Sequence, residues 1–441
     1  MGNNQKGSLL VGRLACCSLY NCRMNERMKR IAIIGGGAAG LAAAIAAGDR
    51  ARELGVPVEV VVYERDDRVG RSILATGNGR CNFSNLELEM GEYRNADFVK
   101  RVFESAGDER FVCDFFDGLG LEWRAEPDGR LYPLANKASV VVDVLRAAAA
   151  DLGVREACEC EVVSIEPPRE DGKPFTMRMK DGEFQRADAV VLACGGRMAA
   201  SIEAAGVPFT PMRPVLGPLR VSDEEIPLVR ELDNIRVKSS VTLVREQDGK
   251  SIAIATEQGE LMFRKYGVSG ICVFNLSRLV QPGDTLSICF LRDDLHGQAE
   301  SYLQARIRKL GERFGEGLTY GQVLRGMLLP RVSEALLKSV GLKLEDSCTK
   351  RDLDDLASLL TSFSLEVAGI GDADLCQVRR GGFAVEAVSS ETMQVHDRPG
   401  LFIVGEALDV DGPCGGYNLH WAWTSGCLSG RSAVNSLLEI E

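Results

Sequence analysis

A glycine-rich turn near the start of the chain constrains the fold more than any other feature. It separates an apolar run, expected as a strand over 30–34, from an alanine-rich run, expected as a helix ending near Leu54. Its G-x-G-x-x-G spacing allows a tight turn, close approach of a pyrophosphate and close packing of helix on strand. The phosphate would meet unpaired N–H groups at the helix N-terminus. We therefore expect a dinucleotide at Gly35, Gly37, Ala38, Ala39 and Gly40.

A second apolar run, Val58 to Tyr63, ends in Glu64 and completes a predicted βαβ unit. A carboxylate at this point is placed to accept hydrogen bonds from the adenosine ribose, and it would repel a 2′-phosphate. The turn is therefore expected to bind FAD or NAD rather than NADP, and by itself it does not distinguish FAD from NAD. Arg65 and Arg71, which follow this strand, are expected to belong to the same cofactor site.

Composition disfavours several other classes of protein. The 441 residues include 63 acidic and 52 basic ones, a net charge of -11, so a nucleic acid is not an expected partner. The 14 cysteines include no C-x-x-C pair and the three histidines are far apart, which predicts no metal site and a cytoplasmic protein with reduced thiols. No apolar run is long enough for a membrane span. Residues 1–27 are expected to be a disordered extension.

The C-terminal part of the chain distinguishes FAD from NAD. An expected strand over 401–404 is followed by an acidic segment and then by a glycine-rich start of a last helix. This arrangement resembles the second flavin-contacting segment of glutathione-reductase-type FAD folds. The resemblance implies an acidic contact to the ribityl or pyrophosphate region, and a helix N-terminus whose potential would stabilise the anionic reduced flavin. The residues implied are Gly405, Glu406, Asp409, Gly416, Tyr417 and Asn418.

Clustered Gly and Asn over 70–85 predict an irregular loop directly after the expected ribose-binding strand. Together with 28–64, 259–270 and 405–430, this loop resembles a bacterial family of NAD(P)/FAD-dependent oxidoreductases that includes a 3-dehydro-bile-acid Δ4,6-reductase and aminoacetone oxidase-like proteins. The resemblance covers nearly everything from Met28 onward. We expect the reactive ring of FAD to face this loop. The expected contacts are Gly77, Asn78, Gly79, Arg80, Cys81 and Asn82, with Gly195 after a strand over 189–193.

The resemblance implies an α/β fold with a glutathione-reductase-type FAD-binding Rossmann domain. This domain is expected to be discontinuous, with an inserted β-barrel and a small helical domain. The implied boundaries are 28–203 and 372–441 for the FAD-binding domain, 204–292 and 347–371 for the barrel, and 293–346 for the helical domain.

Some residues depart from the usual pattern of that family. Arg264 and Lys265 stand where Thr-His is usual, Ile271 stands where Pro is usual, and Arg379 and Arg380 stand where Thr and a small residue are commoner. If these loops line the substrate cleft, four cations would favour an acidic substrate, bound by Arg379 and Arg380. A solvated surface is an equally weighted alternative.

Three side chains are candidates for chemistry beyond cofactor binding. Cys81 has no resolving cysteine close in sequence, so a small residue packed near the flavin is favoured over a redox thiol. Tyr417 and His420 are candidate proton donors near the flavin. Packing at the start of a helix is the commoner role for such residues.

The resulting functional hypothesis is an FAD-dependent oxidoreductase that takes hydride from NADH or NADPH and reduces an unsaturated or carbonyl-conjugated small molecule. The protein would supply orientation and electrostatics and the cofactor the reaction. The chain has no second G-x-G-x-x-G motif, so the expectation of a nicotinamide donor depends on the family resemblance alone. Two alternatives stay open: an oxidase of a small amine or alcohol that uses O2, and a non-catalytic flavin-binding sensor or RNA-modification accessory protein.

Overall fold

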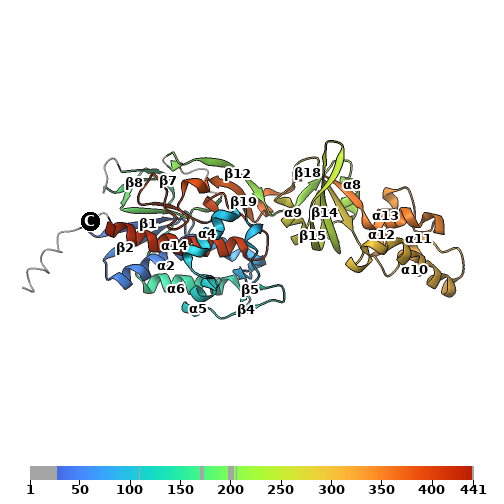
Figure 1. Ribbon diagram of the computed structural model, residues 1–441, viewed down its shortest axis with the longest axis horizontal. Helices are drawn as coiled ribbons and strands as arrows, with labels where there is room; N and C mark the ends of the chain where they lie inside the picture. Colours follow the sequence, from blue (N-terminus) through green and yellow to red (C-terminus); the bar gives the residue numbers. More distant parts are fainter. Residues whose placement is uncertain (1–26, 109, 169–172, 197–202, 205, 440–441) are drawn as a thin grey trace, which may run out of the picture.

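The computed structural model describes residues 27–108, 110–168, 173–196, 203–204 and 206–439. Along the long axis of Figure 1 they form three bodies in a row: a part built on a parallel sheet, a β-barrel and a group of helices. The beginning and the end of the described chain, blue and red, lie together in the first body. The middle of the chain forms the other two.

A five-stranded sheet forms the centre of the first body. All neighbouring strands are parallel, in the order β20-β10-β1-β2-β6. Such a sheet is covered on both faces, so its strands other than the edge strand β6 are short, nearly continuous apolar runs. Because β20 pairs with β10, the C-terminal segment returns to the N-terminal sheet. The strands are Lys29–Ile34 (β1), Val58–Tyr63 (β2), Arg155–Ala157 (β6), Ala189–Leu192 (β10) and Leu401–Ile403 (β20).

Two long helices, α2 (Ala38–Leu54) and α14 (Tyr417–Glu439), pack against each other beside this sheet (Figure 1). Their contact is unusually close because glycines of α14 lie on the backbone of α2. A Cβ atom at Gly426 would overlap the carbonyl oxygen of Ala39, and one at Gly430 would overlap that of Ala43. The small residues of both helices therefore fix how they pack.

Smaller elements complete the first body. The helices are α3 (Arg71–Leu74), α4 (Ala96–Ala106), α5 (Phe111–Gly118) and α6 (Ala138–Asp151). A three-stranded sheet contains β3 (Ser84–Asn85), β4 (Trp123–Ala125) and β5 (Arg130–Pro133). A four-stranded sheet contains β7 (Val162–Glu166), β8 (Phe175–Met179), β9 (Phe184–Ala187) and β11 (Glu203–Ala204). A two-stranded ribbon, β12 (Phe209–Val215) and β19 (Val378–Phe383), leads to the second body (Figure 1).

Six strands close the barrel of the second body in the order β13-β16-β15-β14-β17-β18. They are Leu219–Val221 (β13), Arg236–Gln247 (β14), Lys250–Arg264 (β15), Gly267–Ser269 (β16), Thr285–Cys289 (β17) and Phe363–Ile370 (β18). The helices α8 (Ile226–Glu231) and α9 (Ile271–Ser277) belong to this part. Alternate residues of a barrel strand point inward, and in β15 these include the fully buried Leu261 and Phe263.

The third body consists of four helices that share a hydrophobic core with the barrel. They are α10 (Ala299–Phe314), α11 (Tyr320–Leu324), α12 (Pro330–Ser339) and α13 (Leu353–Thr361). A capping box between Thr319 and Gln322 sets the start of α11. Among the described residues, no helix is long and apolar enough to span a membrane.

The predicted βαβ unit and the Rossmann-type core are confirmed. In the middle of the chain, short apolar runs in the sequence predict strands over 240–244 and 252–255. In the structure both are parts of the much longer hairpin β14–β15. Asp248 and Gly249 form its turn with φ of 51° and 71°, the left-handed values that a tight hairpin turn requires. The boundaries proposed for the three domains stay a prediction, and residues 1–26 lie outside the described part of the chain.

Candidate functional site: a dinucleotide site at the edge of the parallel sheet

The glycine-rich turn follows β1 and is held by the end of β2. The amide of Gly35 donates to the carbonyl oxygen of Tyr63 at 2.8 Å, and that of Gly36 donates to Oε2 of Glu64 at 2.7 Å. Gly35 has φ of 102°, and a Cβ there would lie 2.5 Å from the carbonyl oxygen of Ala193. Gly37 is the N-cap residue of helix α2, and no side chain caps the helix there. Its first N–H groups therefore suit a phosphate.

Glu64 has a role in this turn that the sequence pattern did not indicate. Its Oε2 binds Gly36, and its Oε1 accepts the amide of Asp66 at 2.9 Å. The carboxylate therefore joins the turn to the segment after β2. The ribose contact stays a prediction. Nearby, Arg65 lies 3.9 Å from Asp66 and Arg71 lies 3.5 Å from Asp67, both largely exposed pairs.

Two further turns, after β10 and β20, lie against the first. Gly405 has φ of 62°, and a Cβ there would lie 2.9 Å from that of Ala39 in α2. A Cβ at Gly196, next to Gly195, would lie 2.6 Å from Oε1 of Glu406. Turns at the carboxyl ends of neighbouring parallel strands meet at one edge, where such sheets bind ligands. The structure therefore brings together the predicted groups around Gly35, Gly195 and Gly405.

The loop before α14 is shaped by the side chain of Asn418. Its Oδ1 accepts the amide of Gly412 at 2.9 Å, and its Nδ2 donates to the carbonyl oxygen of Gly412 at 2.9 Å. From the barrel side, Oδ1 of Asn275 accepts the amide of Cys414 at 2.8 Å. Gly416 has φ of 101°, and a Cβ there would overlap the backbone of Ser84. Asn418 thus organises the loop in which we expected it to meet the flavin.

The Gly77–Asn82 segment contains several residues in the left-handed region. Gly77, Asn78 and Cys81 have φ of 56°, 56° and 59°, and Gly79 also has positive φ. Asn82 is buried, and its Nδ2 donates to the carbonyl oxygens of Ser84 and Leu131 at 2.8 and 3.0 Å. Arg80 lies over the ring of Tyr132, 4.6 Å from its centroid. Strained backbone of this kind is typical of binding sites.

Asp409 is engaged by Arg94, which donates to its two carboxylate oxygens at 2.8 and 2.9 Å, and by the amide of Gly381 at 3.0 Å. Its predicted contact with the cofactor stays untested. The strong pairing with Arg94, a residue more than 300 positions away, was not visible in the sequence.

Arg380 belongs to a buried ion-pair network. It donates to Asp411 at 2.8 and 2.7 Å, and Arg278, at the end of α9, donates to Asp411 at 2.8 Å. Burial would raise the pKa of Asp411, but hydrogen bonds and the charges of Arg380 and Arg278 lower it below 3.8. Because Arg278 belongs to the barrel body, Asp411 ties the two bodies together. Arg380 therefore has a structural role beside the substrate role predicted for it.

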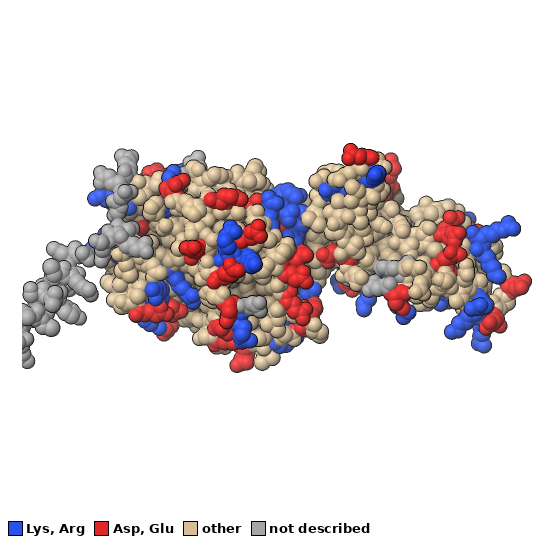
Figure 2. Space-filling model, viewed as in Figure 1, with Lys and Arg blue, Asp and Glu red and all other residues tan. Residues whose placement is uncertain are grey.

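The other three cations of the predicted acidic-substrate cleft have different surroundings. The backbone amide of Arg379 donates to Glu406 at 2.6 Å, and the residue as a whole is partly buried. Arg264 donates to Asn234 at only 3.4 Å, and Lys265 is exposed in the turn after β15. Figure 2 shows basic side chains gathered on the viewed face where the first body meets the barrel.

The two predicted proton donors differ in their surroundings. Burial lowers the pKa of His420 to about 3, and its Nδ1 lies 2.8 Å from Oγ of Ser84. The imidazole is therefore neutral at physiological pH, which argues against an acid role. Burial raises the pKa of Tyr417, whose hydroxyl accepts the amide of Glu89 at 3.1 Å. Burial also raises the pKa of Cys81 to about 12, so its thiol is a poor nucleophile.

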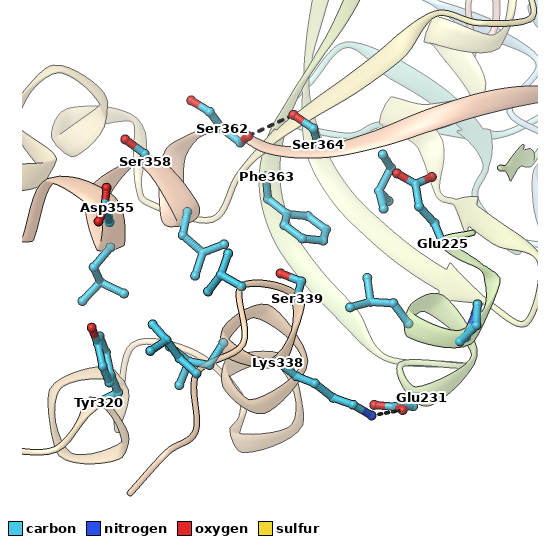
Figure 3. A pocket seen from close by; sticks show the side chains of 18 of the residues that line it. Glu225, Glu231, Tyr320, Lys338, Ser339, Asp355, Ser358, Ser362, Phe363 and Ser364 are labelled. Atoms are coloured by element: carbon cyan, nitrogen blue, oxygen red, sulfur yellow. Dashed lines mark hydrogen bonds and ion pairs between the residues drawn. The ribbon is translucent and has the colours of Figure 1, made fainter. Parts of the chain in front are cut away.

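A separate groove of about 1000 Å³ lies between α8 of the barrel and the helices α12 and α13 (Figure 3). Its walls mix apolar side chains with serines and charged residues. The labelled charges are mostly acidic, and Lys338 pairs with Glu231 at 2.5 Å. None of the predicted cofactor or substrate residues lines it. The glycine-rich edge of the sheet is therefore the candidate site.

Comparison with known proteins shows the family of the chain. The model of the HI0933-like protein Rossmann domain matches residues 29–432. The 3-dehydro-bile acid delta(4,6)-reductase of Clostridium scindens is 31% identical over 426 residues, covering 92% of this chain and 99% of that protein. A ribosomal RNA dihydrouridine synthase of Escherichia coli is 29% identical over 414 residues, covering 91% and 96%.

Among solved structures, the open conformation of a flavocytochrome c3 fumarate reductase aligns with 96% of this chain and 81% of its own, at 16% identity and a TM-score of 0.44. The family match extends over almost the whole described chain and includes all three glycine turns. As the resemblance in the sequence predicted, the chain belongs to the HI0933-like family of FAD-binding Rossmann proteins.

Proposed function

We propose that this protein is an FAD-dependent reductase that adds hydride and a proton across a carbon–carbon double bond conjugated to a carbonyl group. The observation that carries the proposal is the end-to-end similarity to a 3-dehydro-bile acid delta(4,6)-reductase. The name of a second relative, a ribosomal RNA dihydrouridine synthase, also describes the saturation of a double bond next to a carbonyl. The two substrates differ, but the bond that is reduced is of one class.

The residues of the site fit FAD in this proposal. The first turn of α2 would hold the pyrophosphate, and Glu406 would contact the ribityl region beside Gly195. The N-terminus of α14 would face the pyrimidine edge of the flavin, and the Gly77–Asn82 segment would lie along the ring. Bound FAD would supply the hydride chemistry, while these residues orient it. The open helix N-terminus at Gly37 supports this assignment.

We further propose NADH or NADPH as the electron donor and a small molecule with an acidic group as the substrate. The position of Arg379, a cationic residue that is hydrogen-bonded through its backbone to Glu406, supports an acidic substrate. The same proposal includes a glutathione-reductase-type subdivision with the barrel and helices as inserted domains at 204–292 with 347–371 and at 293–346. The pairing of β20 with β10 supports this division.

Reduction of uridine in ribosomal RNA is a second candidate function. It is favoured by the E. coli synthase and by a synthase of Haemophilus influenzae that is 26% identical over 409 residues. The net charge of -11 weighs against an extended RNA surface. The basic group in Figure 2 is where RNA contacts would be sought.

The test is anaerobic stopped-flow spectroscopy of the purified flavoprotein with NADH and with NADPH. The reduced enzyme is then mixed with 3-oxochola-4,6-dienoate, with a ribosomal RNA transcript that contains unmodified uridine, or with O2. Rapid flavin reduction followed by reoxidation with the steroid acid supports the proposal. Reoxidation by the RNA alone supports the second candidate. Fast reoxidation by O2 without nicotinamide reduction supports an oxidase and contradicts both reductases.

A further inference from the structure

Glu257 occupies an unusual position for a carboxyl group. It lies on β15 opposite Val241. Along this stretch of β15, every second residue, the odd-numbered ones, faces the inside of the barrel. The partner Val241 and the same-parity residues Leu261 and Phe263 are fully buried. A structural residue at position 257 would be expected to be apolar. Glu257 instead places a half-buried carboxyl group on this inward-facing side of β15.

The carboxyl group is held toward the flavin-side loop by one side chain. Asn275 of α9 donates from Nδ2 to Oε2 of Glu257 at 3.0 Å and accepts the amide of Cys414 on Oδ1 at 2.8 Å. Cys414 belongs to the Gly412–Gly416 loop, which leads directly into the N-terminus of α14. A single amide therefore connects Glu257 to the loop expected beside the flavin.

Burial is the main reason why the pKa of Glu257 is raised above its ordinary value. Burial raises its pKa, the hydrogen bond from Asn275 lowers it, Glu92 raises it and Arg278 lowers it, with a net increase. Two thiols also face it, and burial raises the pKa of Cys272 to about 11 and that of Cys414 to about 12. Both thiols are therefore neutral and add no charge at physiological pH.

Other proton-bearing groups near this loop are poorer acids. His420 is neutral with a pKa of about 3, and burial raises the pKa of both Tyr417 and Cys414. A general acid works best when its pKa lies near the working pH. Among the described acidic groups around the Gly412–Gly416 loop, Glu257 is the one whose pKa shifts from its ordinary value toward neutral pH.

We propose that the carboxyl group of Glu257 is the proton donor of the reduction, an assignment that rests on the proposed function. Bound reduced FAD would supply a hydride to the carbon β to the carbonyl, and the electron pair of the double bond would then form an enolate. The proton of Glu257 then bonds to the α carbon and leaves a carboxylate. Hydride and proton together saturate the bond, and Glu257 regains a proton from water.

The first experiment compares wild type with E257Q, E257D and E260Q. Glu260 is a matched control because it lies on the same strand, faces outward and pairs with Arg236 at 2.9 Å. Each protein is reduced anaerobically with dithionite and mixed with 3-oxochola-4,6-dienoate across a pH series. E257Q is expected to slow flavin reoxidation by about 100-fold and to lose the acid-dependent limb of the pH profile. E257D is expected to recover part of the rate, and E260Q to match wild type.

Equal rates in E257Q and wild type overturn the proposal, as does a loss that E257D and E260Q share. If the steroid acid does not reoxidise the reduced wild type, that result counts against the proposed substrate chemistry. A second measurement therefore examines Glu257 without turnover. Infrared titration of wild type minus E257Q is expected to show a protonated carboxyl band that disappears above the ordinary glutamate pKa of 4.5. A band that disappears at or below that value overturns the assignment whatever the substrate is.

Discussion

At the scale of single residues, the carboxylate of Glu64 joins the glycine turn to the segment after β2, because it accepts the amides of both Gly36 and Asp66. Gly35, Gly37 and Glu64 lie where the pattern placed them because strand, turn and helix are contiguous in sequence. The hydrogen bond from Gly36 to Glu64 was not expected, since the motif describes ligand contacts alone. The neutrality of His420 was also hidden, because its burial depends on Ser84 and Phe103, over 300 positions away.

The first prediction concerns the anchor between Glu64 and the glycine turn. The two carboxylate oxygens of Glu64 accept the backbone N–H groups of Gly36 and Asp66. In E64Q one of these oxygens becomes an NH2 group, which cannot accept, so one hydrogen bond to a charged group is lost. Such bonds contribute about 1.5–3 kcal/mol, which corresponds to FAD binding weaker by about 10- to 100-fold. Fluorescence titration of the apoprotein with FAD measures this change. E53Q, at an exposed residue of α2 paired with Arg50, is the control, and equal affinities in E64Q and E53Q would contradict the role of Glu64.

The second prediction concerns pH and His420. Its folded pKa of about 3 lies below the ordinary 6.5, so the unfolded chain binds the proton first as pH falls. The stability that neutral His420 contributes is complete above 6.5 and is lost between 6.5 and about 3. Within this window, each unit by which the pH falls lowers the free energy of unfolding by about 1.4 kcal/mol. Thermal unfolding midpoints from pH 7 to pH 5 should fall less in H420Q than in wild type, and a variant of the exposed His396, H396Q, should follow wild type.

At the scale of elements, strongly patterned segments were predicted well and their ends less well. Four strands of the parallel sheet, β1, β2, β10 and β20, are nearly continuous apolar runs, and the sequence predicted them. The hairpin β14–β15 was predicted as short fragments because its outer half is exposed on both faces and lacks alternation. Its Asp248-Gly249 turn was the signal that would have joined the fragments.

The third prediction belongs to the contact between α2 and α14. In G426A the added methyl group meets the carbonyl oxygen of Ala39, at the second residue of the helix that we expect to bind the pyrophosphate. Overpacking of this kind costs about 1–3 kcal/mol, and the shift of α2 should also weaken FAD binding. Thermal unfolding and FAD titration measure both effects. G311A in α10 is the matched control, since a Cβ there meets no atom within 4 Å, and it should be neutral or stabilising.

At the scale of the whole molecule, the sequence resemblance implied three bodies but not what joins them. The joint is Asp411, whose side chain is fully buried between Arg278 of the barrel body and Arg380 of the ribbon. Arg278 and Asp411 are 133 positions apart, so no local pattern could reveal the pair. The segments that contain β12 and β19 form the covalent connection, and the ion pairs of Asp411 add a buried non-covalent contact between the barrel and the Rossmann part.

The last prediction follows from this joint. D411N leaves two buried guanidinium groups without their counter-charge, which costs about 3–5 kcal/mol for a buried pair. Because the folded pKa of Asp411 lies below 3.8, wild type keeps this stability above pH 3.8 and loses it as pH falls through the folded value. We expect D411N at pH 7 to unfold at a lower temperature and to be cleaved faster at the ribbon by trypsin. The largest dimension measured by small-angle X-ray scattering should increase as the barrel separates from the sheet. D294N removes the exposed pair with Arg292 and should change neither measurement. If D411N and D294N behave alike, the barrel is held by its apolar contacts instead of by Asp411.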